Sequence, residues 1–243
     1  MKLRVMSYNI QHAMEHEGWL RDKSHVINFD MIADVIRRYD PDVVGLNEVR
    51  DRGAHPEYRE QTLEIARRLG YEYCYFAKAI DFGDGPYGNA IISKIPLKKA
   101  WTVPIPDPVY KNSGGYYESR CILKAQFEEP VRFDVLISHF GLPASEQRNA
   151  VSMMMQLLEG REVPTIAMGD YNMTPDNPTL YPLLAAMKDT AELLPEGTMT
   201  FPTEGPKIKI DYILVSEDIR PVSAEAPAII ASDHCPYIAD LEL

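Results

Sequence analysis

The segment VPTIAMGDYN, residues 163–172, decides how the rest of the chain is interpreted. Its first six residues have the character of a buried strand, and this strand runs directly into Asp170 and Asn172. Asp and Asn readily bond their own backbone in turns, so a plain strand-to-loop corner is one explanation. The other is that the two side chains take part in chemistry. The remainder of the chain has to separate these explanations.

Length and composition set the first bounds. The chain has 243 residues, of which 45% are hydrophobic and 25% charged, as in an ordinary globular protein with a sizeable core. No linker, repeat or low-complexity stretch divides it, so we expect a single domain over residues 1–243. The net charge of −11 disfavours tight nonspecific binding to nucleic acid but leaves a small or singly phosphorylated substrate open.

Cysteine usage and hydropathy suggest a compartment. The three cysteines are far apart and form no CxxC pair, which is typical of reduced thiols in a cytoplasmic protein. The N-terminus lacks an apolar run of signal-peptide length. No stretch approaches the roughly 20 apolar residues of a membrane span. We therefore expect a cytoplasmic protein without a transmembrane segment.

The order of apolar runs predicts the fold class. Period-two and continuous apolar runs predict strands at residues 3–10, 42–49, 71–80, 89–96, 120–127, 131–140, 163–168, 209–216 and 237–243. Helical patterns cover residues 29–40, 58–71, 145–160 and 179–187, with Gly70 as a C-terminal cap and Ser145 as an N-cap. Hairpin-like neighbours outnumber strict β-α-β alternation. This pattern predicts an α/β protein with two mixed sheets packed face to face and helices outside.

Polar side chains stand where these strands begin or end. Ligands and reacting groups gather there because loops carry polar side chains on a rigid scaffold. Several carboxylates would be costly in a core unless a divalent cation offset their charge, and an all-oxygen set suits Mg²⁺ better than Zn²⁺. The strand-end residues are Asn9, Glu48, Asn89, Arg120, His139, Asp170, Asn172, Asp211, Asp233 and His234.

Short motifs in a fixed order resemble a known family. The pieces are SYNI, LNEV, YGNAIISKIP, ESR, SHFG, GDYN, KIDYILVS and SDHCPYIADL, which together span residues 7–242. They resemble the endonuclease/exonuclease/phosphatase superfamily, which includes pancreatic deoxyribonuclease, abasic-site endonuclease, neutral sphingomyelinase and the inositol polyphosphate 5-phosphatases. The resemblance implies a four-layer αββα sandwich and metal-dependent hydrolysis of a phosphoester.

The resemblance also implies which residues hold the metal and the water. Glu48 matches the family's metal-binding glutamate, and Asn9 matches the asparagine that supports this site. Asp233 matches a ligand that reaches the metal directly or through water. Asp170 matches the aspartate that aligns or deprotonates the attacking water, and Asn172 matches the asparagine on the phosphoryl oxygen. The implied cofactor is Mg²⁺ or Mn²⁺.

The remaining strand-end residues match groups around the phosphate. His234 matches the phosphate-stabilising histidine, and Asp211 the carboxylate that orients it. His139 matches a histidine that nuclease and sphingomyelinase members place on the phosphate, with a possible acid role toward the leaving group. Arg120 and Asn89 match polar positions near the substrate. Plain structural explanations stay open for three of them: Asn9 as a strand-end cap, His139 as a core histidine, and Arg120 as an ion-pair partner of Glu118 or Glu129.

Two departures from the family narrow the interpretation. Gln11 stands where some nucleases carry an aspartate, which puts a two-metal site in doubt, and the basic aromatic insertions of the nucleases are missing. His12, His16 and His25 lack ligand spacing, so the polar segment 11–25 is expected to be a solvated loop. Residues 11–27 and 111–120 are the expected substrate loops.

Three functions remain open. The first is a metal-dependent hydrolase of a small or lipid-type phosphomonoester or phosphodiester. The second is a DNA or RNA endonuclease or exonuclease, which would need a local basic strip made of Lys111, Arg120, Lys207 and Lys209. The third is a catalytically inactive binding module, which the presence of Glu48, Asp170 and His234 disfavours.

Overall fold

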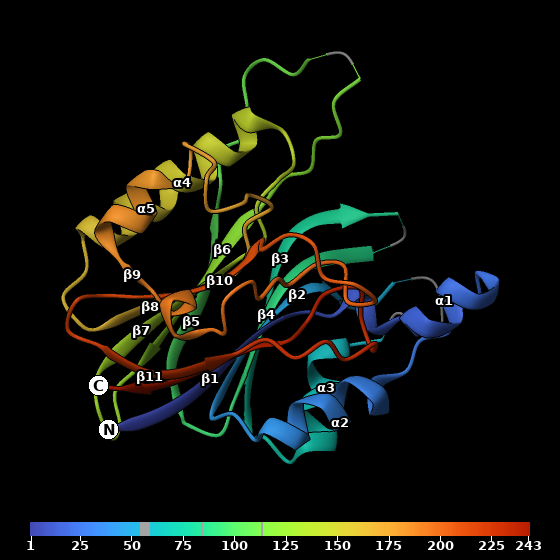
Figure 1. Ribbon diagram of the computed structural model, residues 1–243, viewed down its shortest axis with the longest axis horizontal. Helices are drawn as coiled ribbons and strands as arrows, with labels where there is room; N and C mark the ends of the chain where they lie inside the picture. The colour runs from blue at the N-terminus through green and yellow to red at the C-terminus, as the bar shows by residue number, and fades with distance from the viewer. Residues whose placement is uncertain (54–58, 84, 113) are drawn as a thin grey trace.

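Residues 1–53, 59–83, 85–112 and 114–243 are described by a computed structural model, which contains two six-stranded sheets (Figure 1). The first sheet has the order β11-β12-β1-β2-β4-β3, with β1 Lys2–Asn9, β2 Val43–Arg50, β3 Tyr73–Phe82, β4 Gly85–Ser93, β11 Arg220–Glu225 and β12 Tyr237–Glu242. The second has the order β5-β6-β7-β8-β10-β9, with β5 Leu97–Pro104, β6 Cys121–Phe127, β7 Phe133–Ser138, β8 Thr165–Asp170, β9 Lys188–Asp189 and β10 Asp211–Val215.

Helices cover the outer faces of both sheets. Figure 1 shows α2 (Phe29–Tyr39) and α3 (Gln61–Leu69) on one outer side and α4 (Ala144–Glu159) and α5 (Tyr181–Ala186) on the other. The chain also forms α1 (His16–Asp22) and two short 3-10 helices, η1 (Gln11–Ala13) and η2 (Thr190–Leu193). Among the described residues, none of the helices combines the length and the apolar character that crossing a membrane requires.

Three buried clusters account for the layering. The central cluster joins the two sheets, with Val5 and Val43 on one side and Ile137 and Met168 on the other. A second cluster packs α2 and α3 onto the first sheet, and a third packs α4 and α5 onto the second sheet. Each sheet is mixed, because β1 pairs with β2 and β7 with β8 in parallel. The predicted four-layer αββα sandwich is confirmed.

The helix boundaries follow from local chemistry. In α2 the stripe of Ile32, Val35 and Ile36 is buried, and the Asn28 side chain accepts a hydrogen bond from the Met31 amide at 3.0 Å. Gly70 ends α3 with a φ of 71°, as predicted; the predicted start of this helix at residue 58 lies outside the described residues. The predicted N-cap of α4 was wrong.

Helix α4 begins one residue before the predicted cap. Pro143 occupies the N-cap position in extended conformation, and its carbonyl accepts from the Gln147 amide at 3.1 Å. Ser145 therefore lies inside the first turn and not at the N-cap position. Proline is favourable here because it fixes φ and the first amides of a helix have no partner within it. Gly160 lies just past the end of the helix.

The strands that the sequence did not predict are edge strands. β5, β9 and β11 each lie at the border of a sheet. β5 and β11 are mostly half-buried or exposed, so their sequences, LKKAWTVP and RPVSAE, lack an apolar run. β9 has only two residues. A hydrophobic pattern is a signal of burial, and an edge strand carries little of it.

The topology brings the strand ends together. In the first sheet Asn9 at the end of β1 pairs with Asn47 of β2. In the second sheet Asp170 at the end of β8 pairs with Asp211 at the start of β10. The carboxyl ends of parallel strands meet at one edge of a sheet, and stacking the two sheets places both edges at the same end of the sandwich. This end carries the candidate site.

Candidate active site

The predicted site residues converge on one oxygen atom, Oδ2 of Asp170. The amide nitrogen Nδ2 of Asn9 lies 3.1 Å from it and also donates to Glu48 Oε1 at 3.1 Å. Nε2 of His139 lies 3.4 Å from the same oxygen, and Nε2 of His234 lies 3.5 Å from it. Asp170 is almost fully buried. Residues from β1, β2, β8 and the loops after β7 and before β12 thus share one centre.

The GDYN segment is both a turn and part of this centre. Gly169 has a φ of 144°, and a Cβ there would lie 1.9 Å from the Ser138 carbonyl oxygen, so only glycine fits. The Asn172 amide donates to Asp170 Oδ1 at 2.9 Å, which is the expected turn hydrogen bond. The turn therefore leaves Oδ2 of Asp170 for the other residues of the site.

A β-bulge aims two successive residues of β2 at the site. The pairing of β2 with β4 shifts between Leu46 and Val49, and Glu48 has a left-handed φ of 58°. In a regular strand Asn47 and Glu48 would point to opposite faces. Here Asn47 Oδ1 accepts from the Asp170 amide at 2.9 Å, while Glu48 accepts from Asn9. Sequence analysis missed Asn47, although a buried asparagine in an apolar strand was a usable signal.

Asn89 lies behind the centre. Its side chain is 1% exposed, accepts from Asn47 Nδ2 at 2.8 Å and donates to the Cys121 carbonyl at 3.1 Å. It is absent from the described residues that line the cavity. The geometry therefore places Asn89 as a support for Asn47, in a different position from the substrate contact expected from the sequence.

His234 is held by a buried carboxylate. Its Nδ1 lies 2.9 Å from Asp211 Oδ2, and the ring of Phe201 lies 4.7 Å from the imidazole, centroid to centroid. Burial lowers the pKa of His234, but the carboxylates of Asp211 and Asp170 outweigh it and raise this pKa to about 10. His234 is therefore a cation whose Nε2 hydrogen faces Asp170.

His139 has the opposite electrostatic surroundings. Its Nδ1 lies 3.0 Å from Arg120 Nη1, and Arg120 in turn forms a buried ion pair with Glu118. Burial, with Arg120 and His234 as positive neighbours, holds the pKa of His139 well below its usual value. Nδ2 of Asn172 lies 3.1 Å from His139 Nε2. Arg120 thus forms the ion pair with Glu118 that the sequence analysis left open, and it also contacts His139 of the site.

The pKa values of two carboxyl groups in the centre are raised, whereas that of His139 is lowered. Burial raises the pKa of Asp170 to about 7, against the lowering effect of His234. Burial also raises the pKa of Glu48, and the nearby Asp233 carboxylate adds to this effect. Groups whose pKa values are moved by burial and by specific charges are typical of functional sites.

Two groups of side chains could hold a metal ion. Asp170, Asp211 and His234 offer ligand atoms within 4.8 Å of one another. In that group, however, Nδ1 of His234 is already bonded to Asp211. The second group is Glu48 with Asp233, whose carboxylates repel each other and whose oxygens are ligands that Mg²⁺ prefers. The donor set thus fits a hard divalent cation.

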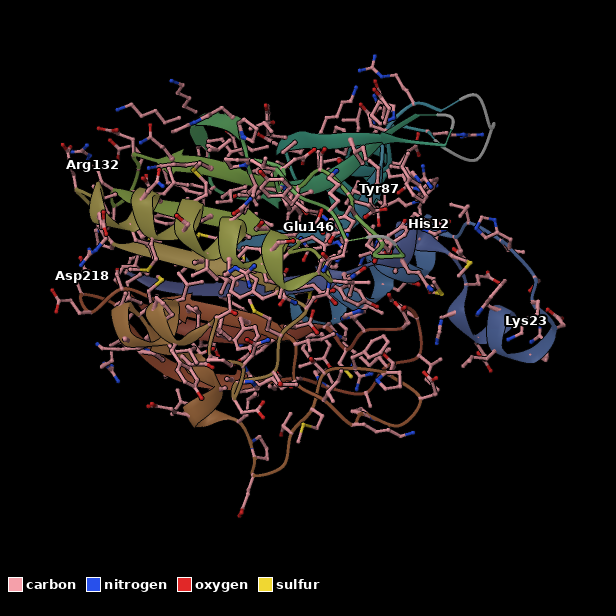
Figure 2. The ribbon with its side chains drawn as sticks, turned by 90° about the horizontal axis from the view of Figure 1, so that it is seen from above. His12, Lys23, Tyr87, Arg132, Glu146 and Asp218 are labelled. Carbon is pink, nitrogen blue, oxygen red and sulfur yellow. The ribbon has the colours of Figure 1, made fainter. Side chains whose placement is uncertain are left out.

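A cavity of about 370 Å³ opens onto this centre. Glu48, Asp170, Asp233 and the two histidines line it on one side. Apolar side chains also line it: Tyr116 lies in the expected substrate loop 111–120, whereas the sequence analysis did not select Phe82, Tyr87, Leu142 and Phe201. Figure 2 shows Tyr87 and His12 toward one end of the molecule and Arg132 and Asp218 toward the other.

The expected solvated loop around the three histidines was wrong. His16 is 5% exposed and lies 3.1 Å from Gln11 Oε1 and 3.2 Å from Glu204 Oε2, so it ties the N-terminal segment to the loop after Phe201. His12 Nε2 lies 3.1 Å from His25 Nε2, and His12 lines the cavity. Helix α1 escaped detection because its sequence, HEGWLRD, has no apolar stripe.

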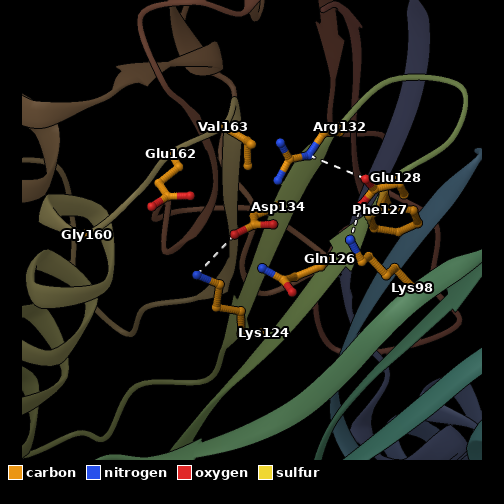
Figure 3. A pocket seen from close by; sticks show the side chains of 10 residues that line it. All are labelled: Lys98, Lys124, Gln126, Phe127, Glu128, Arg132, Asp134, Gly160, Glu162 and Val163. Carbon is orange, nitrogen blue, oxygen red and sulfur yellow. Dashed lines mark hydrogen bonds and ion pairs between the residues drawn. The ribbon is translucent and has the colours of Figure 1, made fainter.

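A second cavity, of about 150 Å³, is lined by residues of β5, β6 and β7 and by the loops that follow β6 and α4 (Figure 3). Its basic side chains face acidic ones, with Lys124 Nζ 3.0 Å from Asp134 and Arg132 Nε 3.7 Å from Glu128. The charges in this cavity are thus matched within the protein. It has none of the converging carboxylates and histidines of the site at Asp170.

Comparison with known proteins agrees with the geometry. A family model described as the endonuclease/exonuclease/phosphatase family matches residues 6–234. Among curated proteins, no sequence matches the chain significantly. An endonuclease/exonuclease/phosphatase from Beutenbergia cavernae has a similar structure, with a TM-score of 0.77 and 25% identity over 100% of this chain and 72% of that one.

Two other solved structures share the fold at lower identity. A mannosyl-6-phosphatase from Bacteroides thetaiotaomicron has a TM-score of 0.77 and 17% identity, covering 99% of this chain and 100% of the other. The human Nocturnin catalytic domain has a TM-score of 0.71 and 18% identity, covering 99% and 94%. At such identities the likeness shows the fold alone.

Proposed function

Because the chain belongs to the endonuclease/exonuclease/phosphatase family, whose members hydrolyse phosphoester bonds, we propose that it hydrolyses a small or lipid-type phosphomonoester or phosphodiester. The observation that carries the proposal is the convergence of Asn9, His139 and His234 on Asp170 Oδ2 beside Glu48. In-line attack on phosphorus needs a positioned water, donors for the phosphoryl oxygens and a donor for the leaving oxygen. This centre offers a buried carboxylate that can orient a water and several N–H donors for the oxygens of the phosphate.

Asp170 is our candidate for orienting and deprotonating the water. Its Oδ1 accepts from the Asn172 amide, and its side chain lines the cavity, so the carboxylate can accept a proton from a water bound there. A general base works best when its pKa lies near the working pH, and burial raises that of Asp170 to about 7. Asn172 and the two histidines then supply N–H groups to the phosphoryl oxygens, and Asp211 keeps His234 charged and oriented.

The metal site of our proposal consists of Glu48, with Asn9 and Asp233 beside it. Mg²⁺ or Mn²⁺ bound there would neutralise charge on the phosphoryl group. The protein's own contribution is to hold Glu48 through the bulge and through Asn9 Nδ2. Asn89 supports the same centre indirectly through Asn47.

The cavity supports a small substrate with an apolar part. It holds about 370 Å³, and its outer wall includes Tyr116 and Leu142, which are 55% and 57% exposed. A mannosyl-6-phosphatase with the same fold shows that this sandwich can carry a site for a small phosphomonoester. For this chain, the lining combines carboxylates, basic side chains and apolar side chains, which suits one phosphate group with an organic substituent.

A nuclease function has weak support. The net charge is −11, and the basic strip that could offset it is largely engaged within the protein. Lys209 is buried against Asp189 at 3.1 Å, Arg120 pairs with Glu118, and Lys111 lies 3.7 Å from Asp107. Because counterion release needs exposed Lys and Arg on phosphates, we expect poor affinity for duplex DNA.

A phosphoester panel tests the proposal. The full chain is assayed on bis-p-nitrophenyl phosphate, p-nitrophenyl phosphate, sphingomyelin, inositol phosphates and plasmid DNA, with Mg²⁺, Mn²⁺ or EDTA. We expect metal-dependent turnover of a small or lipid phosphoester and none of plasmid DNA. Turnover confined to plasmid DNA would favour the nuclease, and no turnover on any phosphoester would contradict the proposal.

We also propose a cytoplasmic location, which the free thiols of Cys74, Cys121 and Cys235 support.

A further inference from the structure

Two histidines direct Nε2 at Asp170, and their Nδ1 atoms have opposite partners. Nδ1 of His234 lies 2.9 Å from a carboxylate oxygen of Asp211. Nδ1 of His139 lies 3.0 Å from Nη1 of Arg120. A carboxylate can only accept a hydrogen bond and a guanidinium can only donate one. The two partners therefore impose opposite hydrogen positions on the two rings.

We propose that Arg120 is a positioning residue that fixes His139 as the neutral tautomer with its hydrogen on Nε2. The guanidinium donates to Nδ1, so Nδ1 carries no hydrogen. A neutral imidazole has one N–H and one acceptor nitrogen, so Nε2 of His139 carries the hydrogen. A doubly protonated ring would set a second N–H against the N–H of a buried cation.

Arg120 is itself held in place by the protein. Its Nη2 forms an ion pair with Glu118, and the side chains of both residues are less than a tenth exposed. The Glu118 amide donates to Glu146 Oε1 at 2.9 Å, and the Tyr116 hydroxyl donates to Glu118 Oε1. Both terminal nitrogens of Arg120 thus have partners within the protein. An arginine that binds phosphate as a fork would instead present both nitrogens to the cavity.

With the hydrogen on Nε2, the contact of His139 with Asn172 is not a hydrogen bond, and Asp170 Oδ2, 3.4 Å from Nε2, is the acceptor on this side of the ring. Asn172 Nδ2 lies 3.1 Å from His139 Nε2, and the same amide donates to the Phe140 carbonyl at 3.0 Å. Both nitrogens carry hydrogens, so neither can accept from the other. Two donors side by side at the cavity fit one shared acceptor, such as a phosphoryl oxygen.

The tautomer also limits what His139 can do, a point that rests on the proposed function. To protonate a leaving oxygen from Nε2, a ring already accepting at Nδ1 would have to become an anion. His139 is therefore restricted to donating a hydrogen bond. The acid role toward the leaving group, which the resemblance implied, does not fit this site.

Nitrogen NMR tests the tautomer without reference to catalysis. Long-range ¹H–¹⁵N correlation spectra of the full chain labelled with ¹⁵N-histidine report which ring nitrogens carry hydrogens, and His139→Gln assigns the signals. We expect an unprotonated Nδ1 and a protonated Nε2 for His139, and a shift toward mixed tautomers in Arg120→Met. A hydrogen on Nδ1 of His139 in the parent would overturn the proposal, even if the enzyme proves to be a phosphohydrolase.

Kinetics on the best substrate of the panel separates positioning from phosphate binding. We expect Arg120→Met to lower kcat on the order of 10²-fold, with KM changed less than about threefold. A raised KM with unchanged kcat would make Arg120 a phosphate ligand instead. Glu118→Gln is the matched control, since its amide oxygen still accepts from Nη2 and the tautomer should persist. If circular dichroism shows that Arg120→Met is unfolded, the double variant Arg120→Met/Glu118→Leu replaces it, because it removes both charges of the buried pair. The NMR spectrum of the parent protein decides the tautomer of His139 even without a variant.

Discussion

Asp211 and His234 form a buried pair, with the carboxylate oxygen Oδ2 lying 2.9 Å from Nδ1 of the imidazole. Asp211 sits at the first position of β10, where its amide lies 3.2 Å from Thr200 Oγ1. A carboxylate so placed orients the ring and favours its charged form. The pair therefore controls which hydrogens His234 can offer toward Asp170.

Asp211→Asn should act through His234. The amide can still accept from Nδ1, but the charge that raises the pKa of His234 is gone, so we expect kcat to fall by at least ~10²-fold. A double-mutant cycle measures the coupling, because Asp211→Asn should add little to the loss already caused by His234→Ala. Additive losses would mean that the two residues act independently.

Asp170→Asn should separate the turn from the chemistry. Asn can accept the Asn172 amide as Asp does, and burial already disfavours the charge of Asp170. We expect the protein to stay folded with a lower melting temperature, because the new Nδ2 would face the N–H groups of Asn9 and the two histidines. Turnover should fall by at least ~10²-fold, because the amide cannot take a proton from water. If a folded Asp170→Asn protein keeps the turnover of the parent, residues 169–172 form a turn without a catalytic role.

Glu48→Gln should weaken metal binding. The change removes one of two neighbouring carboxylates while keeping an oxygen for the Asn9 hydrogen bond. Calorimetric titration with Mn²⁺ should show an affinity at least ~10-fold below that of the parent, with the circular dichroism spectrum unchanged. Glu162→Gln, at the cavity of Figure 3, is a control that should bind Mn²⁺ as the parent does. If Glu48→Gln binds Mn²⁺ as tightly as the parent does, Glu48 is not a metal ligand.

Asn47→Leu should destabilise the protein. The change leaves the buried Asp170 amide and Asn89 Oδ1 without their partner. Each buried polar group without a partner costs about 1–3 kcal/mol, so the free energy of unfolding should drop by about 2–5 kcal/mol. Urea denaturation followed by fluorescence measures this. Asn149→Leu, which alters an exposed hydrogen bond to the Pro106 carbonyl, is the control and should cost less than about 1 kcal/mol.

Lys209 should make stability depend on alkaline pH. Burial lowers its pKa from 10.5 to about 8, despite Asp189 at 3.1 Å. Between these values the unfolded chain binds the proton that the folded protein has lost, so the free energy of unfolding rises with pH. From pH ~7 to ~10 the parent should gain about 2.5 kcal/mol relative to Lys209→Met, as measured by urea denaturation. A constant difference would show that Lys209 stays charged.

Sequence reasoning could find the residues with chemistry but not the backbone that aims them. Asp170, His234 and Glu48 stand out because polar groups at the ends of apolar strands are conspicuous. Asn47 does not, since its direction depends on a bulge that no local pattern marks. One partner of Arg120 was equally hidden: Glu118 was foreseen, whereas His139 follows β7 and meets Arg120 only after β6 and β7 pair.

The predicted fold was right in its core and incomplete at its borders. The runs that became β1, β2, β7 and β8 are apolar because both faces of these strands are covered. β5 and β11 lie at sheet edges and carry charged or small residues, so periodicity had nothing to detect. The burial of His16 depends on Gln11 and on Glu204, which is distant in the sequence, and only the folded chain brings them together.

The left-handed backbone at Glu48 means that thermal stability and metal binding favour different residues at this position. A non-glycine residue in that conformation costs about 1–2 kcal/mol, so Glu48→Gly would relax the backbone there. A library selected only for heat resistance would therefore enrich glycine at position 48 and lose the carboxylate proposed to hold the metal. Screens for durable variants should keep this codon fixed and look for gains elsewhere.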